Sequence, residues 1–197
     1  MNVRRLPTSL VTFTRRTVDL CAPHSADIDV RDIAHALSLT NRFGGHTNEP
    51  YSVAAHSCHV SRLVPQRWAL HALLHDAAEA YLGDLVKPLK HLVSGFAALE
   101  MEVDGAIAER FGLHWGAESF LAVKRADNLA LRTELQMFFP WMHSEATPDP
   151  SNTYQSDDSA FAETTGMRFR LSPIAAEAWF LHEFNLLTAS RTEMVGP

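Results

Sequence analysis

The chain has 197 residues, of which 46% are hydrophobic, and its formal net charge is −6 at pH 7. This length and composition favour one compact domain over residues 1–197, with enough core to fold alone. The negative charge argues against a broad basic surface for a nucleic-acid polymer. No apolar run approaches the roughly 18 residues that span a membrane, and two cysteines give no disulfide framework. We therefore expect a cytoplasmic protein without a signal peptide.

Hydrophobic periodicity and capping residues predict an all-α fold, a compact bundle of about six helices. The helices are expected near residues 29–40, 52–64, 67–82, 95–111, 117–139 and 173–189. Ser52 fits a helix start, Gly83 fits a helix end, and Pro173 fits a first helical position. Residues 8–20 alternate between apolar and polar types and predict a short hairpin or an extended N-terminal arm. Residues 144–160 are rich in Asp, Ser and Pro and predict a mobile surface loop or a lid.

His75 and Asp76 stand side by side in the predicted helix 67–82, which is otherwise almost entirely apolar. A helix that is hydrophobic nearly all round is buried, and a buried Asp beside a buried His is costly unless something pairs with it. A metal cation is a suitable partner because both side chains are metal ligands. Glu79 lies one helical turn beyond His75, so it would sit near the metal without having to bind it.

Two further residues place ligand groups on apolar helix faces. His56 lies on the apolar face of its predicted helix, whereas His59 falls among polar residues and is interpreted as a surface histidine. Alone, His56 also fits a core histidine bonded to a backbone carbonyl. Asp127 is again a charge on an apolar stripe. A mixed His/carboxylate set suits one divalent transition metal (Co, Mn or Zn, with Mg also compatible) better than a closed structural zinc site. The predicted ligands are His56, His75, Asp76 and Asp127.

The order of these residues resembles the HD-domain phosphohydrolase superfamily, in which His, His-Asp and Asp lie on successive helices. More narrowly, motifs within residues 29–135 resemble the bacterial and phage 5′-deoxynucleotidases (YfbR-like). These motifs are residues 42–43, 51–57, 75–79, 83–90 and 124–127. The resemblance implies an all-α HD-type domain that releases phosphate from deoxynucleoside monophosphates with the help of a metal.

The resemblance also implies roles for individual residues. It makes the four predicted ligands the metal site, Glu79 the catalytic acid, Arg42 the arginine that orients the phosphate, and Asp84 a substrate-binding aspartate at the catalytic site. Phe43 stands where the family has Trp, so the base and sugar preference does not follow from the resemblance. Each substrate contact also has a plain interpretation as a turn, cap or solvated surface residue. The expected substrate contacts are Arg42, Phe43, His46, Asp84, Lys87 and Lys90.

Other interpretations stay open at this point. A dNTP triphosphohydrolase would use the same metal site, and a degenerate HD module would bind a nucleotide without hydrolysing it. An oxidative enzyme with two irons needs a second ligand set, for which His91 and His114 lack paired spacing.

Glu134 shares a helix face with Asp127 and could orient Arg42 or a ligand, or pair with a neighbouring arginine. The expected partner is a small-molecule nucleotide, with no nucleic-acid polymer and no membrane. A homodimer or a higher homo-oligomer is compatible with the resemblance.

Overall fold

The computed structural model describes residues 8–143 and 170–193, so the predicted loop or lid at 144–160 lies outside the described residues. The described part confirms the all-α fold. Its helices are α1 (Val30–Leu39), α2 (Val53–Arg62), α3 (Ala69–Leu73), α4 (Glu79–Leu82), α5 (Lys87–Leu92), α6 (Phe96–Phe111), α7 (Ala117–Phe138) and α9 (Pro173–Glu193). Short 3₁₀ turns cover Ser25–Asp27, Arg42–Gly45, Gln66–Trp68 and Pro140–His143. None of these helices is long and apolar enough to cross a membrane.

Polar caps set the beginnings of the first two helices, and the sequence predicted the second of them, Ser52. The side chain of Asp29 accepts a hydrogen bond from the backbone N–H of Arg31 at the start of α1. Ser52 does the same for the N–H of Ala55 at the start of α2. Such caps satisfy backbone donors that have no partner within the helix. At the C-terminal end of α6, Gly112 takes the left-handed conformation that glycine adopts without strain.

The N-terminal segment forms a hairpin rather than an extended arm. Strand β1 (Ser9–Val11) pairs antiparallel with β2 (Thr17–Asp19). The turn between them is tied to α1, because Thr14 donates hydrogen bonds from its backbone N–H and its hydroxyl to the Asp32 carboxylate at 2.6 and 2.7 Å. The hairpin thereby covers one side of the first helix.

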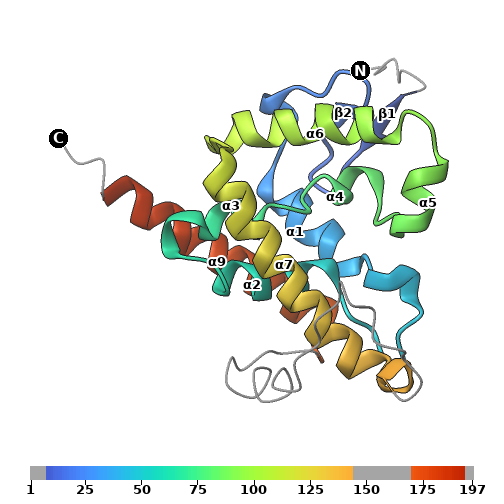
Figure 1. Ribbon diagram of the computed structural model, residues 1–197. Coiled ribbons are helices and arrows are strands. Elements are labelled where there is room, and N and C mark those ends of the chain that lie inside the picture. The colour runs from blue at the N-terminus through green and yellow to red at the C-terminus, as the bar shows by residue number, and fades with distance from the viewer. Residues whose placement is uncertain (1–7, 144–169, 194–197) are drawn as a thin grey trace.

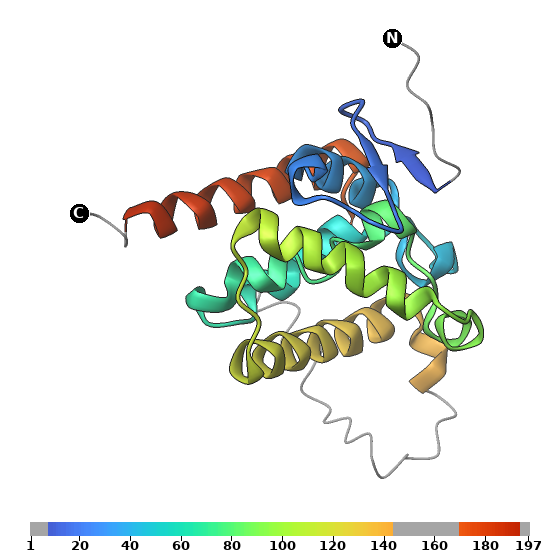
Figure 2. The ribbon, with the colours of Figure 1, turned by 90° about the horizontal axis from the view of Figure 1, so that it is seen from above.

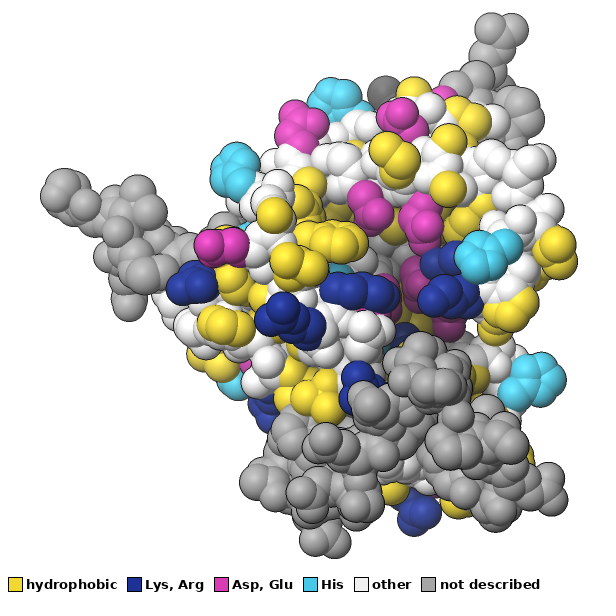
Figure 3. Space-filling view, viewed as in Figure 1, with side chains coloured by type: hydrophobic (Ala, Val, Ile, Leu, Met, Phe, Trp, Pro, Cys, Tyr) yellow, Lys and Arg dark blue, Asp and Glu magenta, His cyan; other side chains and the backbone are white. Residues whose placement is uncertain are grey.

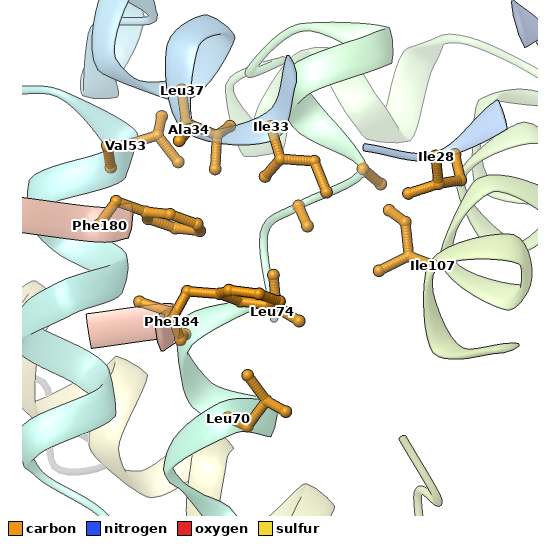
Figure 4. Packing of buried hydrophobic residues seen from close by; sticks show 14 of the residues in the cluster. Ile28, Ile33, Ala34, Leu37, Val53, Leu70, Leu74, Ile107, Phe180 and Phe184 are labelled. Carbon is orange, nitrogen blue, oxygen red and sulfur yellow. The ribbon is translucent and has the colours of Figure 1, made fainter. Parts of the chain in front are cut away.

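The main core lies around the last helix. Helix α9 packs against α1, α2 and α3, and Figure 2 shows α9 and α7 on opposite sides of the pair α2–α3. Phe180 and Phe184 of α9 point into the core, where Phe184 lies beside Leu70 and Leu74 (Figure 4). Helix α7 crosses α2 in Figure 1 and packs against it. Helices distant in the sequence therefore hold α2, the turn after α3, and α7 together.

The predicted continuous helix at 67–82 is wrong. Helix α3 ends at Leu73, residues 74–78 form successive turns, and α4 begins at Glu79. In these turns the N–H of Glu79 bonds to the carbonyl of Asp76, three residues back instead of four. No glycine or proline signals the interruption, which coincides with the two polar side chains that must reach one buried centre. The short helix α5 was not among the six predicted helices, because its six residues are too few to show a helical repeat.

Candidate metal centre

The four predicted ligands lie together, on α2, α7 and the turn after α3. The carboxylate of Asp76 has Oδ2 at 3.6 Å from Nε2 of His56 and at 3.2 Å from Nε2 of His75. Asp127 approaches from α7, with Oδ1 at 3.4 and 3.9 Å from the same two nitrogens. His56, His75 and Asp76 each offer a ligand atom within 4.8 Å of the others, so this group could hold a metal ion.

The tautomers of both histidines follow from their other ring nitrogens. Nδ1 of His56 lies 2.6 Å from Oε1 of Glu134, and Nδ1 of His75 lies 2.8 Å from the carbonyl oxygen of Ala72. A carbonyl and a carboxylate only accept, so each Nδ1 carries the hydrogen and each Nε2 faces the centre. Both Nε2 atoms are buried and have no hydrogen-bond partner among the described residues. Two such nitrogens beside two carboxylates fit a cation.

The electrostatics of the centre favour positive charge at His56. Burial and the charge of Arg42 act to lower its pKa, but Glu134 and Asp127 outweigh them and raise the pKa to about 9. Burial lowers the pKa of His75. The pKa of Asp76 and that of Asp127 both fall below the ordinary value, although burial opposes this, because the facing histidines stabilise the carboxylates. The centre therefore keeps two ionised acids and attracts a cation, whether a proton or a metal.

Glu134 organises the side of the centre that faces away from the ligands. It is fully buried and accepts hydrogen bonds from His56, from the Tyr51 hydroxyl at 2.9 Å and from Nε of Arg42 at 3.1 Å. Burial alone would raise its pKa, but the charges of His56 and Arg42 lower it to about 2. Glu134 thus contacts both Arg42 and the candidate ligand His56, the two partners that the sequence suggested for it.

His59 is buried, so its interpretation as a surface histidine is wrong. Its Nδ1 lies 3.0 Å from the Tyr51 hydroxyl, which itself donates to Glu134, so His59 donates to Tyr51. The ring of Trp179 from α9 covers its other side, with the ring centroids 5.1 Å apart. The polar neighbours of His59 in α2 suggested solvent, but α9 lies there instead.

Arg42 lies against the centre and not on the surface. Its side chain is 13% exposed, with Nη2 at 3.1 Å from Glu134 and Nη1 at 3.6 Å from Oδ2 of Asp76. The loop that carries it turns sharply, and Phe43 has a φ of 57° there, a left-handed conformation that is strained for a bulky side chain. The alternative interpretation of Arg42 as a solvated surface residue is therefore wrong. One end of its guanidinium reaches the ligand cluster.

Glu79 lies beside the centre without joining the ligand cluster. Its Oε1 is 3.4 Å from Nζ of Lys90, and its Oε2 is buried with no hydrogen-bond partner in the part of the chain that is described. Burial, reinforced by the charges of Asp76 and Asp84, raises the pKa of Glu79 to about 8. Burial also raises the pKa of Asp84, which is half-buried. Glu79 therefore keeps its proton at neutral pH.

The remaining predicted substrate contacts, Lys90, Phe43, Lys87 and His46, differ in their partners and in their exposure. Lys90 also pairs with Glu100 at 2.8 Å, and the ring of Phe43 packs edge-on against Phe139. Lys87 and His46 are exposed, and no contact in the described structure joins them to the ligand cluster.

A cavity of about 560 Å³ opens beside the ligand cluster, between α6 and α7. We call it the α6–α7 cavity. Figure 3 shows a hollow below α6, with acidic side chains on its upper edge and basic ones on its lower edge. No motif in the sequence points to this cavity; the only local signal is that Glu100 and Asp104 lie four apart on one helix and so share a face. Its wall includes His75, Asp76, Asp127, Glu100, Asp104, Gly105, Trp115, Phe120 and Lys124.

The fold and the cluster together define an all-α protein with a buried His/carboxylate centre that could hold a metal ion. Over 108 residues, the chain is 44% identical to the uncharacterized protein YfdR of Escherichia coli K12, covering 55% of this chain and 60% of YfdR. Over 152 residues it is 37% identical to the uncharacterized protein RCAP_rcc00048 of Rhodobacter capsulatus, covering 68% of this chain and 78% of that protein. The chain belongs to the family of RCAP_rcc00048. No family model matches it.

Proposed function

We propose that the protein is an HD-type, metal-dependent phosphohydrolase that releases phosphate from deoxynucleoside 5′-monophosphates. The observation that carries this proposal is the pair of buried, unpartnered Nε2 atoms of His56 and His75 between two ionised carboxylates. Hydrogen-bonded imidazoles beside carboxylates are a typical ligand set for a catalytic divalent metal. The residues that would hold the metal are His56, His75, Asp76 and Asp127.

Residues next to the ligands have the chemistry that phosphate ester hydrolysis needs. A bound divalent cation would supply charge neutralisation and lower the pKa of a water molecule. Arg42 presents a planar guanidinium to the centre, which suits a phosphoryl group whose charge is shared over several oxygens. Glu79 carries a proton at neutral pH and gives it to the leaving 5′-oxygen as the P–O bond breaks. The proton lost by the attacking water then restores the acid.

The charges around the cavity support a monophosphate substrate over a triphosphate. Three cations near the centre are already paired with ionised acids: Arg42 with Glu134 and Asp76, Lys90 with Glu100, and Lys124 with Asp127. The α6–α7 cavity adds two acids from α6 to its wall. A longer phosphate chain that entered the cavity would meet negative charge.

The test combines metal binding with product analysis. The purified protein is loaded with Co²⁺, Mn²⁺, Zn²⁺ or Mg²⁺ and supplied with all deoxynucleoside mono- and triphosphates, and phosphate, pyrophosphate and triphosphate are separated by chromatography. We expect phosphate from monophosphates. Asp127→Ala should lose most bound metal, and Glu79→Gln should keep the metal but lose roughly 10²-fold or more in kcat. Glu102→Gln, an exposed site on α6, is the matched control.

Release of pyrophosphate or triphosphate would instead favour the triphosphohydrolase. Nucleotide binding without any product, with every metal, would favour a degenerate binding module.

A further inference from the structure

The α6–α7 cavity extends from the candidate metal centre to residues that have no role in the proposed hydrolysis. Three of the candidate ligands, His75, Asp76 and Asp127, line it, and the rest of its wall includes aliphatic, aromatic and acidic side chains together with Lys124. A phosphate ester bound at these ligands has its leaving group beyond the 5′-oxygen. The cavity offers room for that group, so its wall can select among leaving groups.

The aromatic wall suits a flat ring. Trp115 and Phe120 line the cavity and are 42% and 59% exposed. Trp115 is held from behind by the ring of His71, whose centroid lies 5.0 Å away at nearly a right angle. Large aromatic side chains exposed in a cavity are available to stack on a ligand ring, and such stacking is compatible with every nucleobase.

Gly105, on the α6 side of the cavity, stands at a position where the structure does not require glycine. Gly105 lies inside α6, where glycine weakens a helix relative to alanine. Its φ is not in the left-handed region, and a Cβ added there would meet no atom within 4 Å. Neither backbone conformation nor packing therefore requires glycine. Because Gly105 lines the cavity, its missing side chain leaves space for a ligand to approach the helix.

The acid beside this glycine is available to a ligand. Glu100 is occupied by Lys90 at 2.8 Å. Asp104 lies one turn further on the same wall, and none of the described contacts gives it a hydrogen bond or an ion pair. Burial and the charges of Glu100 and Asp76 raise the pKa of Asp104 to about 7. Above that pH its carboxylate is ionised and only accepts hydrogen bonds, so its natural partner is an N–H group.

We propose that the α6–α7 cavity receives the nucleobase of the substrate and that Asp104 selects bases with an exocyclic amino group by accepting its hydrogen bond. The ring lies between the Gly105 segment of α6 and the aromatic pair Trp115 and Phe120. This inference rests on the proposed function, because it takes the substrate to be a nucleotide. It adds a substrate preference that the ligand cluster does not determine.

Two substrate pairs that differ by one amino group test the selection. These are dGMP against dIMP, and dAMP against the 5′-monophosphate of purine deoxyriboside. We expect the wild type to favour the amino-bearing member by roughly 10-fold in kcat/KM in at least one pair, the scale of one hydrogen bond to a charged group. Asp104→Ala should reduce that ratio to about 1. Glu102→Ala, which removes the same charge from an exposed site of α6, should retain it.

Two substitutions of Gly105 test separately its effect on helix stability and its effect on substrate binding. Gly105→Ala should raise Tm by a few degrees, because alanine favours the helix and its Cβ meets nothing. Gly105→Leu should raise KM for nucleotides roughly 10-fold or more, because its side chain fills the cavity. An unchanged KM in Gly105→Leu overturns the placement of the base.

Binding of nucleosides without phosphate separates this inference from the proposed function. By calorimetry, the amino-bearing deoxynucleoside should bind more tightly than its partner in at least one of the two pairs, deoxyguanosine against deoxyinosine or deoxyadenosine against purine deoxyriboside, and Asp104→Ala should abolish the difference. If no nucleotide is hydrolysed but this difference is found, the proposed function fails and the base cavity stands. Equal affinities and equal kcat/KM values in both pairs overturn the inference. A preference for choline phosphate over every nucleotide also overturns it, since a cation would then be the ligand of the acidic wall.

Discussion

Glu134→Gln is the change that tests the organisation of the centre most directly. Glutamine has nearly the same shape, but it replaces a buried carboxylate that accepts hydrogen bonds from His56, Tyr51 and Arg42. One of its two terminal atoms is an amide nitrogen, which can only donate. Arg42 would lose its closest charged partner, and one of the three donors would meet another donor.

The expected loss of stability can be calculated in two ways. Each pKa unit corresponds to about 1.4 kcal/mol, so lowering the Glu134 pKa from the ordinary 4.5 to about 2 corresponds to about 3 kcal/mol. Removing one partner from a buried ion pair typically costs about 3–5 kcal/mol. We therefore expect Glu134→Gln to lower the free energy of unfolding by about 3 kcal/mol. Metal affinity should also fall roughly 10- to 100-fold, because His56 loses the acceptor that fixes its ring.

Urea denaturation at several pH values is the assay. A lowered carboxyl pKa contributes stability above pH 4.5 and loses it as the pH falls towards 2, so the gap between wild type and variant should close over that range. Glu118→Gln is the control on the same helix, since its side chain is 82% exposed, and should change stability by less than about 0.5 kcal/mol. Equal denaturation midpoints for the two variants, or a gap that does not depend on pH, would refute this reasoning.

Two further predictions concern Arg42 and Asp29. Arg42→Ala should lower kcat, raise KM and destabilise the fold by about 3 kcal/mol, because Glu134 is left buried without its guanidinium; Arg42→Lys should restore little of the activity, since an ammonium lacks the planar fork. Steady-state kinetics and denaturation measure both effects, and wild-type values in Arg42→Ala would contradict the site. Asp29→Ala should lower the free energy of unfolding by about 1–2 kcal/mol, because it removes the cap of α1. An unchanged midpoint would contradict the role of Asp29 as the cap of α1.

Local patterns were enough to predict most helices and to place the ligands on three chain segments. Ser52 and Asp29 cap helices that begin where expected, because capping depends on residues only two or three apart. The apolar faces that carry His56 and Asp127 also follow from helical spacing alone. Such spacing indicates which side chains point inwards, and the structure places these two within 3.4 Å of each other.

The errors arise where distant segments decide the outcome. His59 looked solvated because its neighbours in α2 are polar, yet Trp179 reaches it from 120 positions along the chain. Arg42 also had a plain interpretation as a solvated surface residue, yet its guanidinium pairs with Glu134 on α7. The interruption after Leu73 has no local signal. Contacts of this kind are invisible to periodicity and must be read from the fold.

The place of α9 in the chain has a consequence for how the protein is made. Every candidate metal ligand precedes residue 128, but the helix that closes the core against α1, α2 and α3 begins only at Pro173. A ribosome therefore releases all four candidate ligands before Phe180 and Phe184, and until then the sides of α1 and α2 that face α9 lack that cover. The core around α1, α2 and α3 is therefore complete only once α9 has been synthesised. A chain that stops before α9 should be recognised by chaperones and proteases as unfinished, even though α9 contributes no ligand.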